Sequence, residues 1–447
     1  MQTTNTRYPI LVPTLALALA AAAPPAVAQV SGVITRASLS STGVDANGAS
    51  VTNSATPLSI SSDGRFVAFN SAATNLVSVD TNGIPDVFVR DLLLGTTERV
   101  SVTSSGGQAI GDSSARGSYG TALNADGRYV AFYSYSPNLV SGDTGGFCDV
   151  FVHDCATGAT ERVSVSTSNG SPNNASQYPS ISSDGRYVVF QSGATNLVSG
   201  DKNNNVDVFL RDRSTNVTKR VSVSTAGKDA NGLSSLGLGN TAVSADGRYV
   251  VFHSSATNLV SGDTNGQYDV FLRDLVANTT QRISLTSTAA QTNGWNGQAS
   301  ISADARYVAF YSYAPNLVPG GATVPQPQVY VRDRVLGTTA CASVSSSGVV
   351  SDRAAVVHPA ISGDGRFVTF VSNATNLVAG GTTPGYHVFV RDLALGTTTC
   401  PTASAAPGTT LIDVAIDSLG LHIAFDSLAT NLVPGDTNGV QDVFVIE

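Results

Sequence analysis

The chain has 447 residues, a formal net charge of −8 and 13% charged residues, while 42% of its residues are hydrophobic. Its lysines are Lys202, Lys219 and Lys228, and no run of basic residues occurs. An acidic chain of this kind lacks the positive surface that nucleic acids require, and anionic membranes repel it. We therefore expect neither nucleic acid nor a lipid surface among its partners.

The N-terminal segment has the pattern of an export signal. Arg7 supplies a positive charge, residues 10–23 are mostly apolar, and Ala26-Val27-Ala28 matches the small-x-small cleavage pattern. The apolar stretch is too short to span a bilayer as a helix. The sequence therefore predicts a signal peptide over residues 1–28, no membrane anchor, and a mature chain 29–447 that is periplasmic or secreted.

The mature chain is one unit repeated seven times. A turn signal of the form S-x-D-G-R-[FY]-V opens most copies, and D-V-F-V-R-D or a close relative follows further on. Between the two lies the tripeptide Asn-Leu-Val, which starts at Asn75, Asn138, Asn196, Asn258, Asn316, Asn376 and Asn431. Such spacing is typical of architectures in which each copy is one supersecondary unit.

Each copy is predicted to form four short strands. In the third copy we expect them at residues 179–182, 186–191, 207–211 and 219–224, with a tight turn at Asp184-Gly185. The second and third strands are nearly continuous apolar runs, which indicates burial on both faces. Blades sandwiched between neighbouring blades need this pattern, so the sequence predicts an all-β, seven-bladed propeller of four-stranded antiparallel blades.

The two ends of the chain predict how the ring closes. The seventh copy stops after its third strand, at Asp442–Ile446, and has no fourth strand of its own. Residues 33–39 resemble the fourth strand of the other copies, with Arg36 where they have arginine. We expect this segment to complete the last blade, which leaves no unpaired edge inside the ring. An open array of hairpins is the alternative.

The D-G-R-[FY]-V-x-F and D-V-F-V-R-D motifs together resemble the TolB-type, WD-repeat-like propeller family over nearly the whole mature chain. The resemblance covers the propeller only, because the chain has no room for the α/β domain that precedes it in TolB proteins. It implies an extracytoplasmic propeller with a habit of binding proteins.

The long connections are predicted to lie on one face of the ring, which we call the long-loop face. Rigid scaffolds carry function on such loops. Five of the loops between the second and third strands hold paired aspartates, often with an asparagine, and copies five and six lack both aspartates together. Calcium, which prefers oxygen ligands, is one hypothesis, and Asx turns with a strand cap are the other. The residues are Asp80, Asn82, Asp86, Asp143, Asp149, Asp201, Asn203, Asp207, Asp263, Asn265, Asp269, Asp436, Asn438 and Asp442.

Three further residues are candidate ligand contacts. Trp295 is the only tryptophan and lies in a loop between glycines, whereas His253 and Tyr311 end strands on the long-loop face. His253 and Tyr311 would also be the first suspects for catalysis. The histidines show no metal-ligand spacing, and no Gly-x-Ser-x-Gly elbow occurs.

These observations leave three function classes open. The favoured one is a monomeric binding or scaffolding module with a protein or glycan ligand. The alternatives are a calcium-stabilised structural module and a lyase- or hydrolase-type enzyme. No cofactor other than calcium is expected.

The remaining repeated residues are predicted to be structural. The Asn-Leu-Val triplets would fasten the loops, and the recurring Arg and Asp of the D-G-R and R-D motifs would pair between blades. Cys148 and Cys155 flank a third strand, while Cys341 and Cys400 replace the fourth-strand arginine in copies five and six. These placements keep the cysteines too far apart to bridge, so we expect four free thiols.

Overall fold

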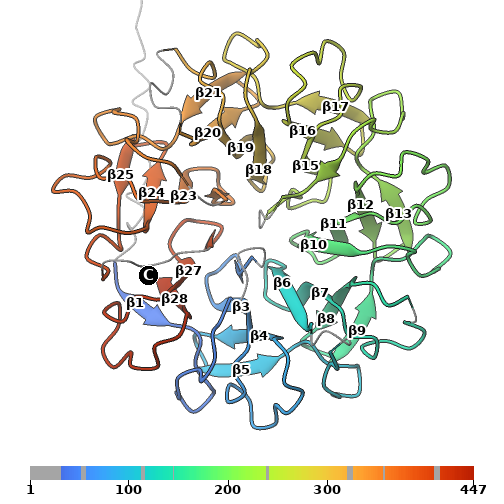
Figure 1. The fold of residues 1–447 in the computed structure, drawn as a ribbon, viewed down its shortest axis with the longest axis vertical. Coiled ribbons are helices and arrows are strands. Elements are labelled where there is room, and N and C mark those ends of the chain that lie inside the picture. Colours follow the sequence, from blue (N-terminus) through green and yellow to red (C-terminus); the bar gives the residue numbers. More distant parts are fainter. Residues whose placement is uncertain are drawn as a thin grey trace, which may run out of the picture.

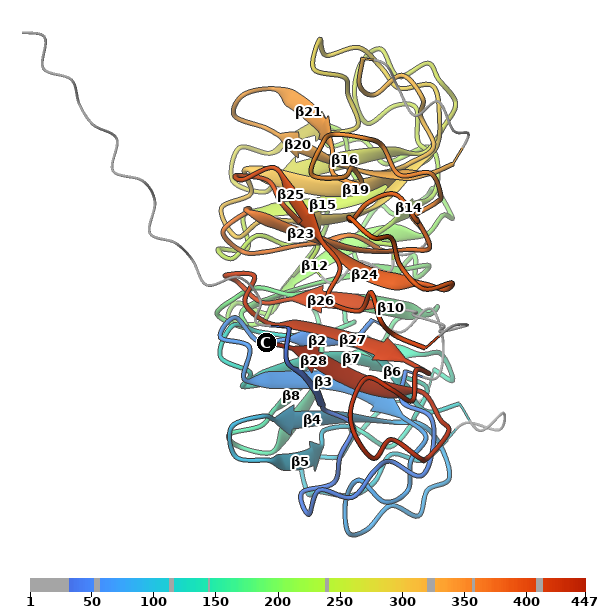
Figure 2. The same ribbon diagram turned by 90° about the vertical axis from the view of Figure 1, so that its left-hand side faces the viewer.

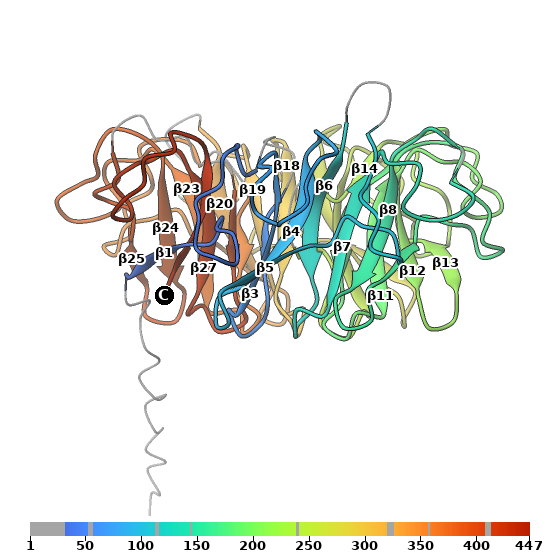
Figure 3. The same ribbon diagram turned by 90° about the horizontal axis from the view of Figure 1, so that it is seen from below.

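The computed structural model shows seven four-stranded antiparallel sheets arranged as blades around one axis (Figure 1). Side views show a flat disc with the blades standing across it (Figures 2 and 3). The described residues are 32–51, 57–111, 116–143, 145–237, 241–319, 326–355, 358–406 and 413–447. Every element in these ranges is a strand. The predicted seven-bladed fold is therefore confirmed, whereas the predicted signal peptide lies outside the described residues.

Within each blade the strands run A to D from the axis outward. Blades one to four are β2 (Ser59–Ile60), β3 (Phe66–Ser71), β4 (Asp86–Asp91) and β5 (Thr96–Arg99); β6 (Ser118–Leu123), β7 (Tyr129–Ser134), β8 (Asp149–Asp154) and β9 (Ala159–Arg162); β10 (Ser176–Ile181), β11 (Tyr187–Ser192), β12 (Asp207–Asp212) and β13 (Val217–Arg220); and β14 (Ser234–Ser235), β15 (Tyr249–Ser254), β16 (Asp269–Asp274) and β17 (Thr279–Arg282).

Blades five to seven are β18 (Asn296–Ile301), β19 (Tyr307–Ser312), β20 (Gln328–Asp333) and β21 (Thr338–Cys341); β22 (Ala360–Ile361), β23 (Phe367–Ser372), β24 (His387–Asp392) and β25 (Thr397–Thr399); and β26 (Val414–Ile416), β27 (Ile423–Ser427), β28 (Asp442–Ile446) and β1 (Ile34–Arg36). This order puts the short A–B and C–D turns on one face and the long connections on the other.

The third blade differs from its predicted strands at the first and last. Strand β10 begins at Ser176 because a bulge between Gln177 and Ser180 lets the chain pair with β11 on both sides of it. Tyr178 in the bulge has a positive φ of 53°. Strand β13 ends at Arg220, four residues before the predicted end. Bulges add a residue that no alternation pattern reveals.

The N-terminal strand closes the ring as predicted. Strand β1 pairs antiparallel with β28, with Ile34 opposite Ile446 and Arg36 opposite Phe444. The Ala37 N–H donates to the Val443 carbonyl at 2.7 Å, which extends the contact beyond the strand. The two ends of the described chain therefore hold each other in one sheet (Figure 1).

The hydrophobic core lies between blades rather than within one. Each buried cluster draws on two consecutive blades, as where Phe69 and Phe88 of blade one meet Val443 and Val445 of blade seven. All six residues of β4 are buried, which confirms the two-sided burial predicted for the third strands. A blade removed from its neighbours would expose both of its apolar faces.

A ring of backbone hydrogen bonds joins the A–B turns around the axis. The donors and acceptors are Ser62 to Ala125, Ala125 to Ser183, Ser183 to Ala245, Ala245 to Ala303, Ala303 to Gly363, Asp364 to Ser418 and Ser418 to Ser62, at 2.9–3.3 Å. One branched aliphatic residue per blade lines the channel at this end, namely Ile60, Leu123, Ile181, Val243, Ile301, Ile361 and Ile416. The cavity here measures only about 110 Å³. The channel is therefore narrow at the short-turn face.

The recurring Arg and Asp pair within blades, which corrects the prediction of inter-blade pairs. Arg65 in the A–B turn donates from Nε and Nη2 to the two carboxylate oxygens of Asp91 at the end of β4. The equivalent pairs, at 2.6–2.7 Å, are Arg65–Asp91, Arg128–Asp154, Arg186–Asp212, Arg248–Asp274, Arg306–Asp333 and Arg366–Asp392. The turn and the end of strand C are adjacent because β3 and β4 are hydrogen-bonded along their whole length.

The glycine of the D-G-R turn packs against the preceding blade at this face. Gly185 has a φ of 73°, and a Cβ there would lie 2.3 Å from the Tyr129 ring of the preceding blade. Glycine suits this turn both for its backbone and for the close packing of the neighbouring aromatic ring. In blade five Ala305 takes its place, with a φ of 58°.

The Asn-Leu-Val triplets tie the two long connections of a blade together. Asn75 donates from Nδ2 to the Asp45 carbonyl at 2.8 Å and accepts from the Asn47 N–H at 3.0 Å. Leu76 is buried beneath them. The predicted structural role is confirmed.

All four cysteines are free thiols in the structure. Burial raises the pKa of Cys148 to about 11 and those of Cys155 and Cys400 to about 12. They remain protonated at neutral pH, which makes them poor nucleophiles and poor partners for thiol exchange.

Deleting residues 29–40 should lower the melting temperature and broaden or split the transition. The deletion exposes the edge of β28 and the apolar surface under Ala37, so blade seven loses its outer strand. Calorimetry of the mature chain and of the truncated chain measures this. An unchanged, single transition would contradict the closure.

Candidate functional site

The paired aspartates converge on an arginine. In blade one, Arg99 of β5 lies between Asp80 and Asp86, with Nη1 3.3 Å from a carboxylate oxygen of each. The same arrangement, at 2.9–3.6 Å, occurs in five blades: Asp80, Asp86 and Arg99; Asp143, Asp149 and Arg162; Asp201, Asp207 and Arg220; Asp263, Asp269 and Arg282; and Asp436, Asp442 and Arg36. The N-terminal strand supplies the arginine of the last triad.

The other predicted loop residues complete these triads. Asn82 donates from Nδ2 to Asp86 at 2.7 Å, and its side-chain oxygen accepts from the Ile84 N–H at 3.3 Å. The hydroxyl of Ser101 donates to the other oxygen of Asp86. Asn203, Asn265 and Asn438 repeat both contacts of Asn82. The asparagine therefore forms the predicted Asx turn, and the aspartate caps the start of strand C.

Blades five and six replace the whole triad. Gln328 stands for the second aspartate in blade five and accepts from the Ser343 hydroxyl at 2.6 Å, while Cys341 stands for the arginine. In blade six His387 binds the Thr402 carbonyl at 2.6 Å, and Cys400 stands for the arginine. Sequence reasoning noted the missing aspartates and the missing arginines separately. Their joint loss was the signal that they form one unit.

Burial governs the electrostatics of the triads. Burial raises the pKa of Asp86 to about 6, although hydrogen bonds from Ser101 and Asn82 and the charge of Arg99 oppose the shift. Burial likewise raises the pKa of Asp80. The carboxylates depend on the guanidinium because two buried anions without a cation would be strongly unfavourable.

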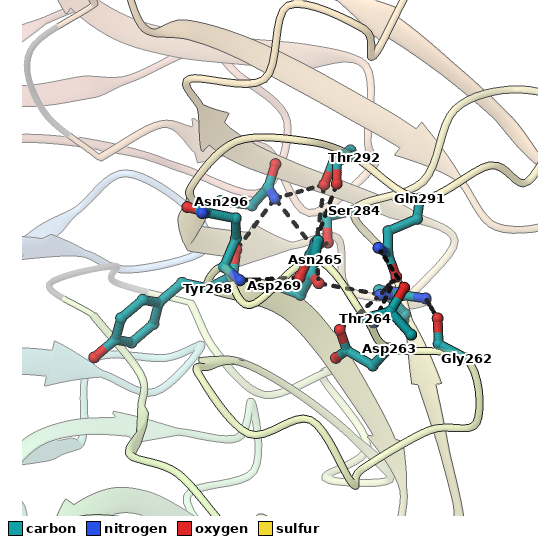
Figure 4. A network of polar contacts seen from close by, with 12 residues as sticks. Gly262, Asp263, Thr264, Asn265, Tyr268, Asp269, Ser284, Gln291, Thr292 and Asn296 are labelled. Atoms are coloured by element: carbon teal, nitrogen blue, oxygen red, sulfur yellow. Dashed lines mark hydrogen bonds and ion pairs between the residues drawn. The ribbon is translucent and has the colours of Figure 1, made fainter.

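In blade four the triad network continues into blade five (Figure 4). Asp269 accepts from Ser284 at 2.6 Å and from Asn296 at 3.2 Å, and Asn296 also donates to the Tyr268 carbonyl at 3.2 Å. Asn296 is the first residue of β18 and follows Trp295 directly. The network therefore fixes the backbone at Tyr268 and at Asn296, next to Trp295.

The structure brings the three predicted ligand contacts together. The Trp295 ring centroid lies 5.9 Å from that of His253 and 5.9 Å from that of Tyr311. Tyr268 and Tyr313, which sequence reasoning did not select, lie 6.2 and 6.1 Å from Trp295. We call these five residues the Trp295 cluster. Tyr313 is 52% exposed, Trp295, Tyr268 and Tyr311 are partly buried, and His253 is buried.

A comparison of the seven copies would have found the missed residues. Strand B ends in Phe-x-Ser in every copy. The residue x differs among the copies, and so does the residue that follows the serine, which we call y. The x residues are Asn70, Tyr133, Gln191, His253, Tyr311, Val371 and Asp426, and the y residues are Ala72, Tyr135, Gly193, Ser255, Tyr313, Asn373 and Leu428. The phenylalanine and serine are structural, since Phe69 stacks on Phe88 and Ser71 accepts from the Ala73 N–H. Variation is thus concentrated at the long-loop end of strand B.

His253 is the buried member of the Trp295 cluster. Burial lowers the pKa of His253 to about 4, and nearby His358 adds to the shift. The imidazole is therefore neutral at pH 7, and its ring contacts both Trp295 and Tyr268. A neutral, buried imidazole packs as an aromatic ring without the desolvation cost of a charge.

Solved structures of known proteins share this fold. An oligogalacturonate lyase from Vibrio parahaemolyticus matches with a TM-score of 0.53 and 12% identity over 93% of each chain. The β-propeller domain of the Trilobed protease from Pyrococcus furiosus matches with a TM-score of 0.50 and 10% identity, over 88% of this chain and 94% of that chain.

TolB from Acinetobacter baumannii is also among the matches, with a TM-score of 0.39 and 16% identity over 70% of this chain. The match spans 58% of the TolB chain. No family model and no curated protein matches the sequence. At these identities the shared feature is the propeller fold, which by itself does not imply a function, and the WD-repeat kinship stays a prediction.

Replacing Arg99 alone should cost much more stability than replacing its whole triad. Arg99→Cys leaves Asp80 and Asp86 buried without a cation, so we expect a loss of about 3–5 kcal/mol in the free energy of unfolding. The triple variant Asp80→Gly, Asp86→Gln, Arg99→Cys reproduces the residues of blade five and should recover most of that loss. Denaturant unfolding of both variants measures the difference. Equal losses would mean that the triad is not a unit.

Calcium separates the two hypotheses for these loops. With Arg99 in place we expect calcium to leave the melting temperature of the native protein unchanged, because the guanidinium occupies the space between the carboxylates. In Arg99→Cys the two carboxylates are free to bind, so calcium should raise the melting temperature of that variant. A calcium-dependent rise in the native protein would instead support the calcium-stabilised module.

Proposed function

We propose that the protein is an exported, monomeric binding module that takes a glycan on the Trp295 cluster of the long-loop face. The observation that carries this proposal is the pattern of variation among the blades. The contacts that hold the ring together repeat from blade to blade, whereas the end of strand B changes its chemistry in nearly every one. A scaffold whose inter-blade contacts are constant and whose residues vary at one end of strand B is suited to recognise a ligand at that end.

The chemistry of the cluster favours a glycan over a protein or a nucleic acid. A sugar ring has an apolar C–H face that packs on aromatic rings, while its hydroxyls bond to phenolic oxygens and amides. Tyr313 and Trp295 offer such rings with partial exposure, and Tyr311 donates its phenolic hydrogen to Tyr313 at 3.5 Å. The name of one structural neighbour, an oligogalacturonate lyase, refers to an oligosaccharide for that protein.

Location outside the cytoplasm fits this role and rests on the signal pattern at residues 1–28. No helix among the described residues is long and apolar enough to cross a membrane. The protein partner implied by the TolB resemblance is the rival ligand. The protein ligand would be supported by a partner protein that no glycan displaces and that still binds a variant without Trp295.

Trp295→Ala should weaken glycan binding at least tenfold, or about 1.4 kcal/mol, because buried aromatic anchors dominate binding energy. A glycan array with the mature protein identifies the ligand, and titration calorimetry compares the variant. Trp295→Phe keeps a ring and should retain most of the affinity, while the melting temperature of each variant reports its folding. Unchanged affinity in a folded Trp295→Ala variant would contradict the proposal.

The same ligand tests the enzyme alternative. Shortened or unsaturated products that appear with the native protein and not with His253→Ala would make the protein a lyase or hydrolase. Ligand recovered intact leaves the binding module as the function.

A further inference from the structure

The Trp295 cluster has a counterpart on the same face. Blades two and five share the tetrapeptide Phe-Tyr-Ser-Tyr, at residues 132–135 and 310–313. In the other five blades the two variable positions of this motif hold no tyrosine. The repeat therefore uses one aromatic arrangement twice, with blades three and four between the two copies.

The second arrangement is also a cluster of rings. Tyr133 lies 5.9 Å from Tyr119 and 5.6 Å from Tyr178 of the next blade, and Tyr135 lies 6.5 Å from Tyr119. The guanidinium carbon of Arg116 lies 3.9 Å from the centroid of Tyr135. We call these five residues the Tyr135 cluster. Tyr133 is buried, like His253 in the first cluster, and Tyr135 is partly exposed.

Amide and hydroxyl groups lie between the two clusters. Gln177 donates to the Tyr135 hydroxyl at 3.2 Å and sits opposite Gln191 on the neighbouring strand. Ser235 of blade four donates to Gln191 at 2.5 Å and sits opposite His253. A chain of polar, uncharged groups thus leads from the Tyr135 cluster to the Trp295 cluster.

The region from blade two to blade five, which we call the arc, also has irregular inner strands. Bulges occur in β6, β10 and β18, and the bulged residues Gly120, Tyr178 and Gln298 have positive φ values of 58°, 53° and 52°. Tyrosine and glutamine are unfavourable in this conformation, which is typical of sites where the backbone aims a side chain at a ligand. The bulge turns Tyr178 onto Tyr133.

The charge of the arc restricts its ligand. Among the described residues of the two clusters and the three polar groups between them, Arg116 is the one ionised side chain, since His253 is neutral at pH 7. Of the x and y positions, the one in blade seven that holds Asp426 is the one with a carboxylate, and Asp426 accepts from the N–H of Asp413 at 2.6 Å. A polyanionic chain would find one cation along the arc and anions across the ring, which disfavours it electrostatically.

We propose that the ligand is an uncharged oligosaccharide that lies across blades two to five and stacks on both clusters. The inference rests on the proposed function and extends it to a second site and to the length and charge of the ligand. Two similar clusters suit a polymer that presents the same sugar face repeatedly. Once one cluster is occupied, binding at the second is intramolecular, so a ligand that reaches both gains affinity from the linkage.

The test uses Trp295 as an internal probe, since it is the only tryptophan in the chain. Uncharged gluco-, manno- and xylo-oligosaccharides, from disaccharides to octasaccharides, are titrated while the tryptophan fluorescence is followed. We expect the affinity to rise sharply, by about a hundredfold or more, at the length that reaches both clusters. Oligogalacturonides of the same lengths should bind more weakly because they are acidic.

Tyr135→Ala separates the second site from the first. This variant should lose the rise in affinity with length and bind long oligosaccharides as weakly as short ones, while short ones still change the Trp295 fluorescence. Leu428→Ala alters the equivalent position in blade seven, outside the arc, and serves as the matched control with unchanged affinities. Tyr135→Phe keeps the ring and should retain most of the length dependence.

The outcomes distinguish the two proposals. If Tyr135→Ala binds every length as the native protein does, or if acidic chains bind more tightly than neutral ones, the inference is overturned and glycan binding at Trp295 stands. If no oligosaccharide perturbs Trp295 in the folded native protein, the proposed function fails and the inference fails with it.

Discussion

The hydrogen bond from the A–B turn of one blade to the A–B turn of the next is the contact on which the rest of the molecule depends. It repeats from Ser62 around to Ser418, which returns to Ser62. The turns must be small to meet at the axis, and the aliphatic residue before each of them narrows the channel. A ring closed in this way presents its long loops, and the variable residues at the end of strand B, at the opposite face.

Repeated contacts also explain where the sequence is free to vary. The D-G-R glycine packs on an aromatic ring of the preceding blade, and the Phe-x-Ser frame packs and caps strand B, so these positions vary little among the blades. The residue between that phenylalanine and serine, and the one after the serine, take no part in these contacts. Half of the residues of the Trp295 and Tyr135 clusters stand at these unconstrained positions, on strands that the ring already holds in place, namely Tyr133, Tyr135, His253, Tyr311 and Tyr313.

The buried triads fix a loop by placing an arginine of strand D between its two aspartates. The one guanidinium offsets part of the negative charge of the two carboxylates, and the serine and asparagine side chains donate hydrogen bonds to the second aspartate. In blade four this same unit reaches Asn296 and thereby the backbone beside Trp295. A structural device of the repeat thus also positions the residues of the proposed site.

The sequence by itself determined the fold, the number of blades, the closure by the N-terminal strand and the two-sided burial of the central strands. These follow from local patterns that repeat seven times, so each copy corroborates the others. It also selected Trp295 as an isolated aromatic residue in a polar loop, and His253 and Tyr311 as residues that end strands on the long-loop face. Only the tertiary structure decided that these residues touch, that Tyr268 and Tyr313 join them, and that each aspartate pair encloses an arginine of strand D. The residues of a triad come from a loop and from a strand that follows it, and in blade seven Arg36 and Asp442 are at opposite ends of the chain. Contacts of this kind arise from strand register and bulges, which place side chains in space without leaving a periodic signal in the sequence.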